Sequence, residues 1–374
     1  MIHFHEAVCA PDELANIEAL LKSDRPWDGS VYEQEVLSSL GDIYPNARMM
    51  LTPSCTSALE LAALTIDIQR GDEVVLPSFT FPSTANAFAL RGACLRFAEI
   101  DPATFTMGLA EISDAITPRT KAVVAMHYNG VGPDIGAIQE LCNQRSIALI
   151  EDNAHGLFAT ANGQPLGSFG KLATLSFHHT KNISCGQGGA LIVNDLSLVD
   201  KAGVYRDKGT NREAFLQGKV PYYHWERVGI NSVPAGLLMA SLAAQFQEAS
   251  NWQNQRQRIW SRYRDTLMPA AAQWGIQLQA VATNVAHAAH AFAFLLPEAI
   301  DRAMFLKRLA IAGVQAVPHY HPLHLAPAAG DQPPLPMTER VAKSIVRLPL
   351  HPNLTENAAI TVSAAVRNAL MQAA

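Results

Sequence analysis

The sequence predicts an α/β fold in which helices cover both faces of a mostly parallel sheet. Its 374 residues, 49% of them hydrophobic, exceed one compact core of roughly 100 to 200 residues, so we expect a large domain and a smaller one. Between residues 49 and 152, strand-like apolar runs alternate with helical ones. This alternation is typical of right-handed crossovers that join parallel strands.

The predicted elements of this region follow one another in a regular order. Short apolar runs indicate strands, and longer periodic runs, one of which begins at a Ser/Thr cap, indicate helices. We expect helices at about 14–21, 54–66, 83–93, from 109 and at 135–145, and strands at 71–79, 94–101, 121–128 and 146–152.

The second half of the chain predicts a smaller, separate unit. A long amphipathic stretch at 237–267 is typical of a connecting helix, so we place the domain boundary there. Residues 1–240 then form the large domain and residues 241–374 a small C-terminal α/β domain, on which the N-terminal segment packs. The Pro- and Ala-rich stretch at 318–336 is interpreted as a surface loop.

Composition and charge exclude several classes of protein. The net charge of -5 and the lack of long Lys/Arg runs argue against a nucleic-acid partner. The N-terminus has no basic start followed by an apolar core, and no apolar run reaches the ~18 residues of a membrane span, so we predict a cytoplasmic protein without a membrane partner. The five cysteines are scattered without CxxC spacing, which is typical of unpaired thiols.

Two charged residues that follow predicted strands are candidates for chemistry. Asp152 ends the strand at 146–152, where a carboxylate can face a protonated ring nitrogen, although a helix cap or a loop salt bridge would also explain it. Lys181 follows the apolar run "LATLSF" without neighbouring charges. It is interpreted either as a solvated surface charge or as a lysine whose amine binds a carbonyl covalently.

Small polar residues and glycines predict a phosphate site nearby. Ser54, Thr56 and Ser57 stand at the start of the helix at 54–66, where free N–H groups attract an anion, or they are ordinary N-caps. Ser176 is a further candidate for an anion. The stretch "GQGG" at 186–189 precedes a strand rather than a helix, so it predicts a turn that allows close backbone approach. Together with an aromatic residue after a strand, these features indicate pyridoxal 5′-phosphate.

The sequence resembles the DegT/DnrJ/EryC1/StrS sugar aminotransferases, which belong to the fold-type I pyridoxal-phosphate enzymes. The resemblance extends over about residues 25–355. It is carried by "MLTPSCTSALELAAL", "GDEVVLPSFTFPSTANAFALRGA", "HYNGV", "IEDNAHG", "SFHHTKN", "GQGGALIVND", "RDKGTNR" and "RLPLHPNLT". It implies a large domain with a mostly parallel sheet between helices and a smaller C-terminal α/β domain.

The resemblance implies a role for each matching residue. Lys181 and Asp152 match the catalytic lysine, which holds the cofactor and moves a proton, and the aspartate at the pyridine nitrogen. Six further residues match cofactor-binding positions for the phosphate, the ring face and the phenolic oxygen: Thr56, Ser57, Phe81, His155, Ser176 and Asn231. Because the family's asparagine at the last position comes from the neighbouring subunit, a homodimer with shared active sites is implied.

The resemblance also implies the substrates, L-glutamate and a nucleotide-linked keto-sugar. The diphosphate of that sugar requires cations, and the candidates are Arg206, Lys208 and Arg212, which are otherwise surface charges. Tyr320 is a further candidate for substrate binding, because it lies where the family's substrate loop falls. The sequence departs from the family's common residues at four positions, His155, Gln187, Val233 and Gly236. These departures leave the implied mechanism intact and the identity of the substrate open. The product would serve surface polysaccharide or secondary-metabolite synthesis.

Two other classes of function compete with this interpretation. His319, His321 and His324 are compatible with a metal-dependent hydrolase, although prolines flank the cluster and an acidic ligand is not evident nearby. A non-catalytic sugar-sensing relative has no use for a lysine at position 181. Relatives that use the cofactor for dehydration carry histidine there, so the lysine favours amino transfer.

Overall fold

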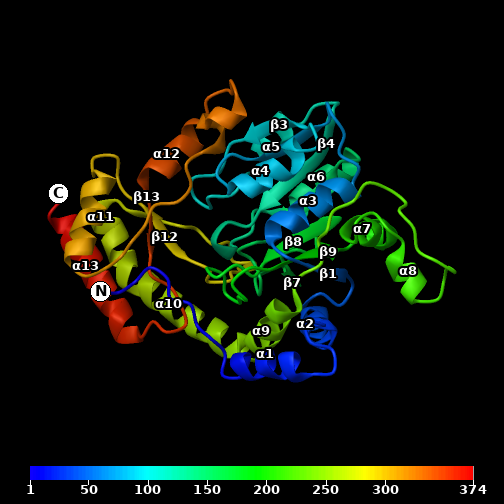
Figure 1. Ribbon diagram of the computed structural model, residues 1–374. Coiled ribbons are helices and arrows are strands. Elements are labelled where there is room, and N and C mark those ends of the chain that lie inside the picture. The colour runs from blue at the N-terminus through cyan, green and yellow to red at the C-terminus, as the bar shows by residue number, and fades with distance from the viewer. Residues whose placement is uncertain (374) are drawn as a thin grey trace.

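The core of the molecule is a seven-stranded sheet with the order β1-β9-β8-β5-β4-β2-β3 (Figure 1). The structure is a computed structural model that describes residues 1–373. The strands are β1 Arg48–Thr52, β2 Glu73–Pro77, β3 Cys94–Ala98, β4 Thr120–Met126, β5 Ala148–Asp152, β8 Leu172–Ser176 and β9 Gly189–Val193. Strands β3, β2, β4, β5 and β8 are parallel, whereas β9 is antiparallel to both β8 and β1. The predicted α/β class with a mostly parallel sheet is therefore confirmed.

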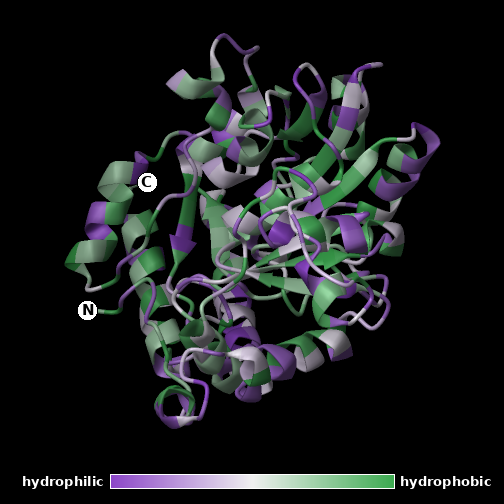
Figure 2. Ribbon diagram, turned by 45° about the vertical axis from the view of Figure 1, so that its right-hand side comes forward, coloured by the Kyte–Doolittle hydropathy of each residue, from purple (hydrophilic) through white to green (hydrophobic). Residues whose placement is uncertain are grey.

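Helices cover both faces of this sheet because successive strand residues point to opposite sides. Val74 and Leu76 of β2 pack toward one group of helices, and Val75 packs toward the other. The first group comprises α3 Cys55–Thr65, α4 Pro82–Ala89 and α7 Val199–Arg206, and the second comprises α2 Ser30–Ile43, α5 Leu109–Ala115, α6 Ile135–Gln144 and α9 Gly236–Gln247. Figure 2 shows hydrophobic residues concentrated on the central strands and hydrophilic ones on the outer helix surfaces.

The C-terminal part of the chain forms a second, smaller layer with its own hydrophobic core. Its sheet has the order β10-β12-β13, and helices pack against it on the left of Figure 1. The elements are α10 Ala249–Trp274, β10 Gln277–Leu278, β12 Phe292–Leu295, α11 Arg302–Ile311, α12 Pro336–Ser344, β13 Ile345–Leu348 and α13 Glu356–Met371. The N-terminus joins this layer, since Ile2 pairs with Val314. The domain boundary at residue 240 stays a prediction.

Two sequence-based expectations differ from the structure. The single helix expected over 237–267 is two helices, α9 and α10, which meet at Glu248. The stretch 318–336 is not a surface loop throughout, because His324 is buried and the N–H of Leu323 donates to the carbonyl of Ser78 at 3.0 Å. The first half of this stretch therefore packs against the loop that follows β2.

The remaining elements are short or peripheral. They are α1 Glu13–Lys22, α8 Arg212–Leu216 and a small sheet of β6 Thr160–Ala161, β7 Gln164–Pro165 and β11 Val285–Ala286. Helix α8 and the chain around it project from the body of the molecule (Figure 1). None of the helices within residues 1–373 combines the length and apolar character of a membrane span, and the predicted cytoplasmic location stays a prediction.

Candidate active site

A cavity of about 410 Å³ lies beyond the carboxyl ends of the parallel strands. Phe81 follows β2, Asp152 is the last residue of β5, and Ser176 is the last residue of β8. Leu348 at the end of β13 lines the cavity from the C-terminal layer. Because parallel strands end at the same edge of a sheet, residues distant in sequence converge there. This convergence was predicted, since the candidate residues directly follow strands.

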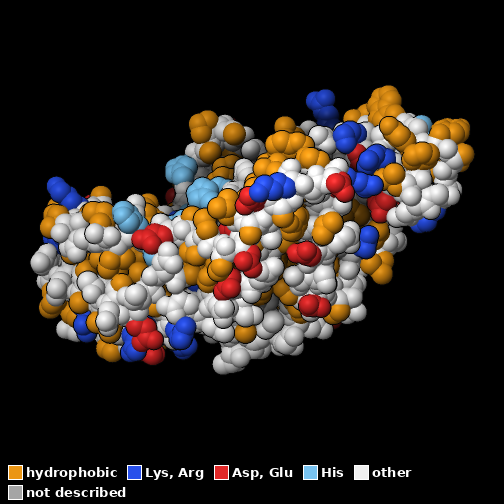
Figure 3. All heavy atoms as spheres, turned by 60° about the horizontal axis from the view of Figure 1, so that its bottom comes forward, with side chains coloured by type: hydrophobic (Ala, Val, Ile, Leu, Met, Phe, Trp, Pro, Cys, Tyr) orange, Lys and Arg blue, Asp and Glu red, His pale blue; other side chains and the backbone are white. Residues whose placement is uncertain are grey.

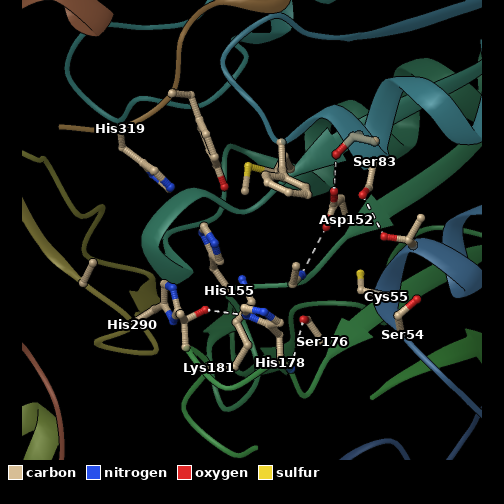
Figure 4. Close-up of a pocket in the computed structure, with 18 of the residues that line it drawn as sticks. Ser54, Cys55, Ser83, Asp152, His155, Ser176, His178, Lys181, His290 and His319 are labelled. Atoms are coloured by element: carbon tan, nitrogen blue, oxygen red, sulfur yellow. Dashed lines mark hydrogen bonds between the residues drawn. The ribbon is translucent and has the colours of Figure 1, made fainter. Parts of the chain in front are cut away.

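Asp152 is a buried carboxylate held by two donors at the end of β5. Thr84 of α4 donates its hydroxyl to Oδ2 at 2.7 Å, and the N–H of Ala154 donates to Oδ1 at 3.2 Å (Figure 4). The preceding Glu151 accepts hydrogen bonds from three backbone N–H groups within residues 167–170, at 2.7 Å each. These bonds anchor the end of β5, so the carboxylate of Asp152 has a fixed position at the cavity.

Lys181 lies in the loop between β8 and β9, and its side chain lines the same cavity. Burial lowers its pKa from 10.5 to about 8, although Cys55 and Asp152 favour the charged form. The next residue, Asn182, donates from Nδ2 to the carbonyl of Ala288 at 2.8 Å and pairs with His290 at 3.0 Å. These two hydrogen bonds hold the loop that carries Lys181 against the C-terminal layer. They give Asn182 a structural role in positioning the lysine.

The start of α3 provides an anion cradle on one side of the cavity. Ser54 caps the helix: its Oγ accepts from the N–H of Ser57 at 3.1 Å and its carbonyl accepts from Ala58 at 3.1 Å. The N–H groups of Cys55 and Thr56 then have no protein acceptor within residues 1–373. A Cβ on Gly189 would lie 2.4 Å from the carbonyl carbon of Ser54, so the glycine turn approaches the helix closely, as predicted.

Histidines and a tyrosine close the opposite side of the cavity (Figure 4). His155 stacks on His290 with ring centroids 4.1 Å apart, and His319 stacks on Tyr320 at 3.5 Å. Burial lowers the pKa of each of these histidines well below 6.5, so the rings are neutral at pH 7. Nδ1 of His155 accepts from the N–H of Asn129 at 3.3 Å, which leaves the proton of the neutral ring on Nε2.

These features fit pyridoxal 5′-phosphate. The unused N–H groups of α3, with Ser176 beside them, suit a phosphate. The anchored carboxylate of Asp152 suits a ring nitrogen, and the amine of Lys181 suits an aldehyde. Phe81 has a 57% exposed side chain at the cavity, where it offers a flat apolar face. The fold and this set of groups define the class of the protein as a fold-type I pyridoxal-phosphate enzyme.

Comparison with known proteins identifies the family. Residues 9–367 match the model of the DegT/DnrJ/EryC1/StrS aminotransferase family, to which the chain belongs. The chain is 30% identical over 97% of its length to a dTDP-4-dehydro-2,3,6-trideoxy-D-glucose 4-aminotransferase of Saccharopolyspora spinosa, 95% of which is covered. It is 31% identical over 85% of its length to a UDP-N-acetyl-3-dehydro-alpha-D-glucosamine 3-aminotransferase of Acidithiobacillus ferrooxidans, 83% of which is covered.

A solved structure supports the same assignment. The aminotransferase TlmJ from Streptoalloteichus hindustanus superposes with a TM-score of 0.89 at 28% identity, over 100% of this chain and 99% of the other. Pyridoxal 5′-phosphate is the cofactor of this family, as predicted. The predicted fold type and cofactor are therefore confirmed.

The structure brings some predicted site residues together and leaves others apart. Eight candidates line the cavity or cap its helix: Thr56, Ser57, Phe81, Asp152, His155, Ser176, Lys181 and Tyr320. Ser57 acts through the cap of α3 and does not line the cavity, which Ser54 does instead. The roles of all these residues stay predictions.

The other four candidates lie outside the cavity of the single chain. Arg206 pairs with Glu33 at 2.9 Å, and Lys208 and Arg212 lie 2.6 and 3.6 Å from the carboxylate of Asp207. The side chain of Asn231 is exposed. The substrate roles of Arg206, Lys208 and Arg212 stay predictions, and the cofactor role of Asn231 depends on the predicted dimer.

The histidines considered as metal ligands do not converge. His319 hydrogen-bonds the hydroxyl of Tyr128 at 2.9 Å, His324 bonds Ser78 at 2.7 Å, and His321 is exposed. Among residues 1–373, no group of three His, Cys, Asp or Glu side chains is placed to hold a metal ion. The contacts of these histidines favour the aminotransferase over the hydrolase.

Several cavity residues were not predicted from the sequence. Phe4 and His5 reach the cavity from the N-terminal segment, and His290 and Arg347 reach it from the C-terminal layer. Arg347 lies in "RLPLHPNLT", a stretch that carries the family resemblance, which was the one available signal. The other three have no local pattern, because only the packing of distant segments places them.

Proposed function

We propose that the protein transfers the amino group of L-glutamate to the 4-keto carbon of dTDP-4-keto-6-deoxy-D-glucose. The observation that carries the proposal is the half-buried amine of Lys181 in one cavity with the anchored carboxylate of Asp152. The family supports it, as does the relative from Saccharopolyspora spinosa, which is named as a 4-aminotransferase of a dTDP-4-dehydro sugar. The galacto product is favoured because "TPSCT", "STANAF" and "KGTNR" resemble dTDP-4-amino-4,6-dideoxygalactose transaminase.

The cofactor supplies an electron-withdrawing ring that makes the carbon bearing the amine acidic. The chain supplies the remaining functions. Lys181 Nζ takes and returns the proton of that carbon, and its pKa of about 8 keeps a useful fraction of the amine neutral near pH 7 to 8. Asp152, held by Thr84, would present its carboxylate to the ring nitrogen of the cofactor. His155, whose Nδ1 accepts from Asn129, would offer Nε2–H as a donor to the phenolic oxygen of the cofactor.

The same machinery can serve other acceptors, which form the alternatives. These are a 3-keto isomer, the gluco product, and a GDP- or UDP-linked keto-sugar. The relative from Acidithiobacillus ferrooxidans, named as a 3-aminotransferase of a UDP-sugar, supports a 3-keto, UDP-linked acceptor as an alternative. Small changes in a pocket alter which sugar face is presented, so the acceptor has to be measured.

We further propose a homodimer in which each cavity is completed by the partner. The projecting segment around α8 exposes apolar side chains, among them Tyr222, Tyr223, Trp225 and Val228. Figure 3 shows hydrophobic and basic side chains gathered at the projecting right-hand end of the molecule. Exposed apolar patches of this kind are typical of protein interfaces. Light scattering of the purified holoenzyme should give twice the chain mass of 40.4 kDa.

The test of the proposed function is a defined amino-transfer assay. Purified holoenzyme receives L-glutamate with dTDP-4-keto-6-deoxy-D-glucose, its 3-keto isomer, or the GDP- and UDP-linked keto-sugars. Mass spectrometry reports the amino-sugar, and proton NMR coupling constants report the configuration at the new amino carbon. A Lys181→Ala variant is the control and should form no product. Failure of the wild type to aminate any of these sugars would refute the proposal.

A further inference from the structure

The cavity contains a buried imidazole, that of His290, with one nitrogen that none of the roles above uses. His290 precedes β12, is 9% exposed and lines the cavity. Its Nδ1 forms a hydrogen bond with Oδ1 of Asn182 at 3.0 Å, whereas its Nε2 has no hydrogen-bond partner within residues 1–373. Buried polar atoms are normally paired, so an unpaired one at a ligand site points to a ligand group that completes it.

The contacts of Asn182 determine which nitrogen of His290 carries the proton. The amide nitrogen of Asn182 donates to the carbonyl of Ala288 at 2.8 Å and to Oε1 of Gln253 at 3.0 Å. The amide oxygen therefore faces His290, and because it can only accept, Nδ1 of the ring donates. Burial and then the charge of Lys181 lower the pKa of His290 well below 6.5, so the ring has a single proton. Nε2 is accordingly a hydrogen-bond acceptor.

The two neighbouring histidines of the cavity have the opposite polarity. Nδ1 of His155 accepts from the N–H of Asn129, so its proton is on Nε2. The hydroxyl of the buried Tyr128 has one hydrogen-bond acceptor within residues 1–373, Nδ1 of His319 at 2.9 Å, and donates to it. The neutral ring of His319 then also carries its proton on Nε2. Of these three rings, His290 is the one whose Nε2 accepts from a ligand.

His290 lies on the side of the cavity where the amine of Lys181 acts. Figure 4 shows His290 and Lys181 on the side away from Ser54 and Cys55, at the start of α3. The charge of Lys181 contributes to the lowered pKa of His290, and Asn182, which directly follows the lysine, holds the ring. A group that donates to Nε2 of His290 therefore belongs to the part of a substrate near its reacting carbon and not to the cofactor phosphate.

The chemistry of the two substrates identifies that group. In dTDP-4-keto-6-deoxy-D-glucose, the carbon on one side of the keto carbon carries the 3-hydroxyl, and the carbon on the other side carries the ring oxygen and a methyl group. The 3-hydroxyl is therefore the one hydrogen-bond donor on a carbon next to the reacting carbon. In L-glutamate the amine is the transferred group, and the carboxylates have no proton to donate at neutral pH.

We infer that His290 selects the keto-sugar by accepting a hydrogen bond at Nε2 from the hydroxyl next to the keto carbon. This inference rests on the proposed function and adds a specificity-determining residue from the C-terminal layer. A keto-sugar without the 3-hydroxyl leaves the lone pair of His290 unpaired in a buried place, and such a mismatch lowers the rate with that sugar. The contact belongs to the acceptor half-reaction, because L-glutamate has no equivalent donor.

The test compares two sugars in the acceptor half-reaction. Enzyme loaded with pyridoxamine phosphate receives dTDP-4-keto-6-deoxy-D-glucose or its 3-deoxy analogue over a range of concentrations, and stopped-flow absorbance follows the cofactor. In His290→Asn the amide nitrogen replaces Nδ1 as the donor to Asn182, and no atom replaces Nε2. In His290→Gln the amide reaches the position of Nε2. His3→Asn is the matched control, since His3 is exposed and does not line the cavity.

The expected result is a preference for the hydroxylated sugar that depends on Nε2 of His290. Wild type should react with the 3-deoxy analogue about 30-fold less efficiently, which is typical of a buried acceptor that loses its donor. His290→Asn should lose about 30-fold with the hydroxylated sugar and less than about 3-fold with the analogue, so its preference disappears. His290→Gln should keep a preference of about 10-fold, and His3→Asn the full one. The reaction of His290→Asn with L-glutamate should change by less than about 3-fold.

Three outcomes would overturn the inference. A wild type that reacts equally well with both sugars makes no contact with the 3-hydroxyl. A His290→Asn variant with the wild-type preference would assign that contact to another residue. Equal losses with both sugars and with L-glutamate would mean that His290 only holds the loop of Lys181. A wild type that reacts with neither sugar refutes the proposed function, and the inference with it.

Discussion

Replacing Lys181 by methionine should make the apoenzyme more stable at neutral pH while abolishing its chemistry. The cofactor-free cavity holds an ammonium that burial destabilises, which is why the pKa falls from 10.5 to about 8. At about 1.4 kcal/mol for each pH unit, this difference corresponds to about 3 kcal/mol of folding free energy. Methionine has a similar length and no charge, so it removes this cost.

The sign of the effect sets its pH dependence. Below pH 8 the lysine is charged in both the folded and the unfolded state, and the folded apoenzyme bears the full cost. Between pH 8 and 10.5 the folded state loses its proton first, so the stability of the wild type rises toward that of the variant. Above pH 10.5 the difference between the two proteins vanishes.

Urea unfolding of both apoenzymes at equal protomer concentration, at pH 7 and pH 10, measures this difference. Replacing the exposed Lys307 of α11 by methionine is the matched control and should change stability at neither pH. A Lys181→Met apoenzyme that is less stable than the wild type at pH 7, or a difference that grows with pH, would refute the reasoning that the cavity desolvates the amine.

Three further predictions concern the same cavity. Thr84→Val removes the hydroxyl that holds Asp152 and should weaken cofactor affinity about tenfold in a titration of the apoenzyme. Gly189→Ala places a methyl group against the backbone of Ser54 and should weaken cofactor affinity by a similar factor of about ten, without loss of folded protein in circular dichroism. EDTA should leave the amino-transfer rate unchanged. If EDTA lowered the rate and a divalent metal restored it, the result would support a metal site at 319–324 instead.

Local sequence was sufficient to predict the parts of the site that lie at the ends of strands. Asp152 and Lys181 follow apolar runs, and the parallel sheet brings such positions to one edge. The turn at 186–189 was predicted in the same way, because a strand follows its glycines. These predictions needed only the order of the elements, which the alternation of periodic segments determines.

The rest of the cavity depends on packing that the sequence does not encode locally. The order of strands places β9 between β1 and β8, and nothing in "ALIVND" indicates that it runs antiparallel to both. The prolines and alanines of the segment 318–336 predict a surface loop, but the N–H of Leu323 in this segment donates to the carbonyl of Ser78, which follows β2. His290 and Arg347 reach the cavity only because the C-terminal layer packs over the strand ends.

The charges of the cavity favour a ligand that carries negative charge. Apart from the histidines, the charged side chains that line the cavity are Lys181, Arg347 and Asp152, so positive charge is in excess there while Lys181 is protonated. We expect the cofactor phosphate at the start of α3, where the N–H groups of Cys55 and Thr56 have no protein acceptor within residues 1–373. Because burial lowers the pKa of His155, His290 and His319, these neutral rings can offer hydrogen bonds to a ligand without adding to the positive charge.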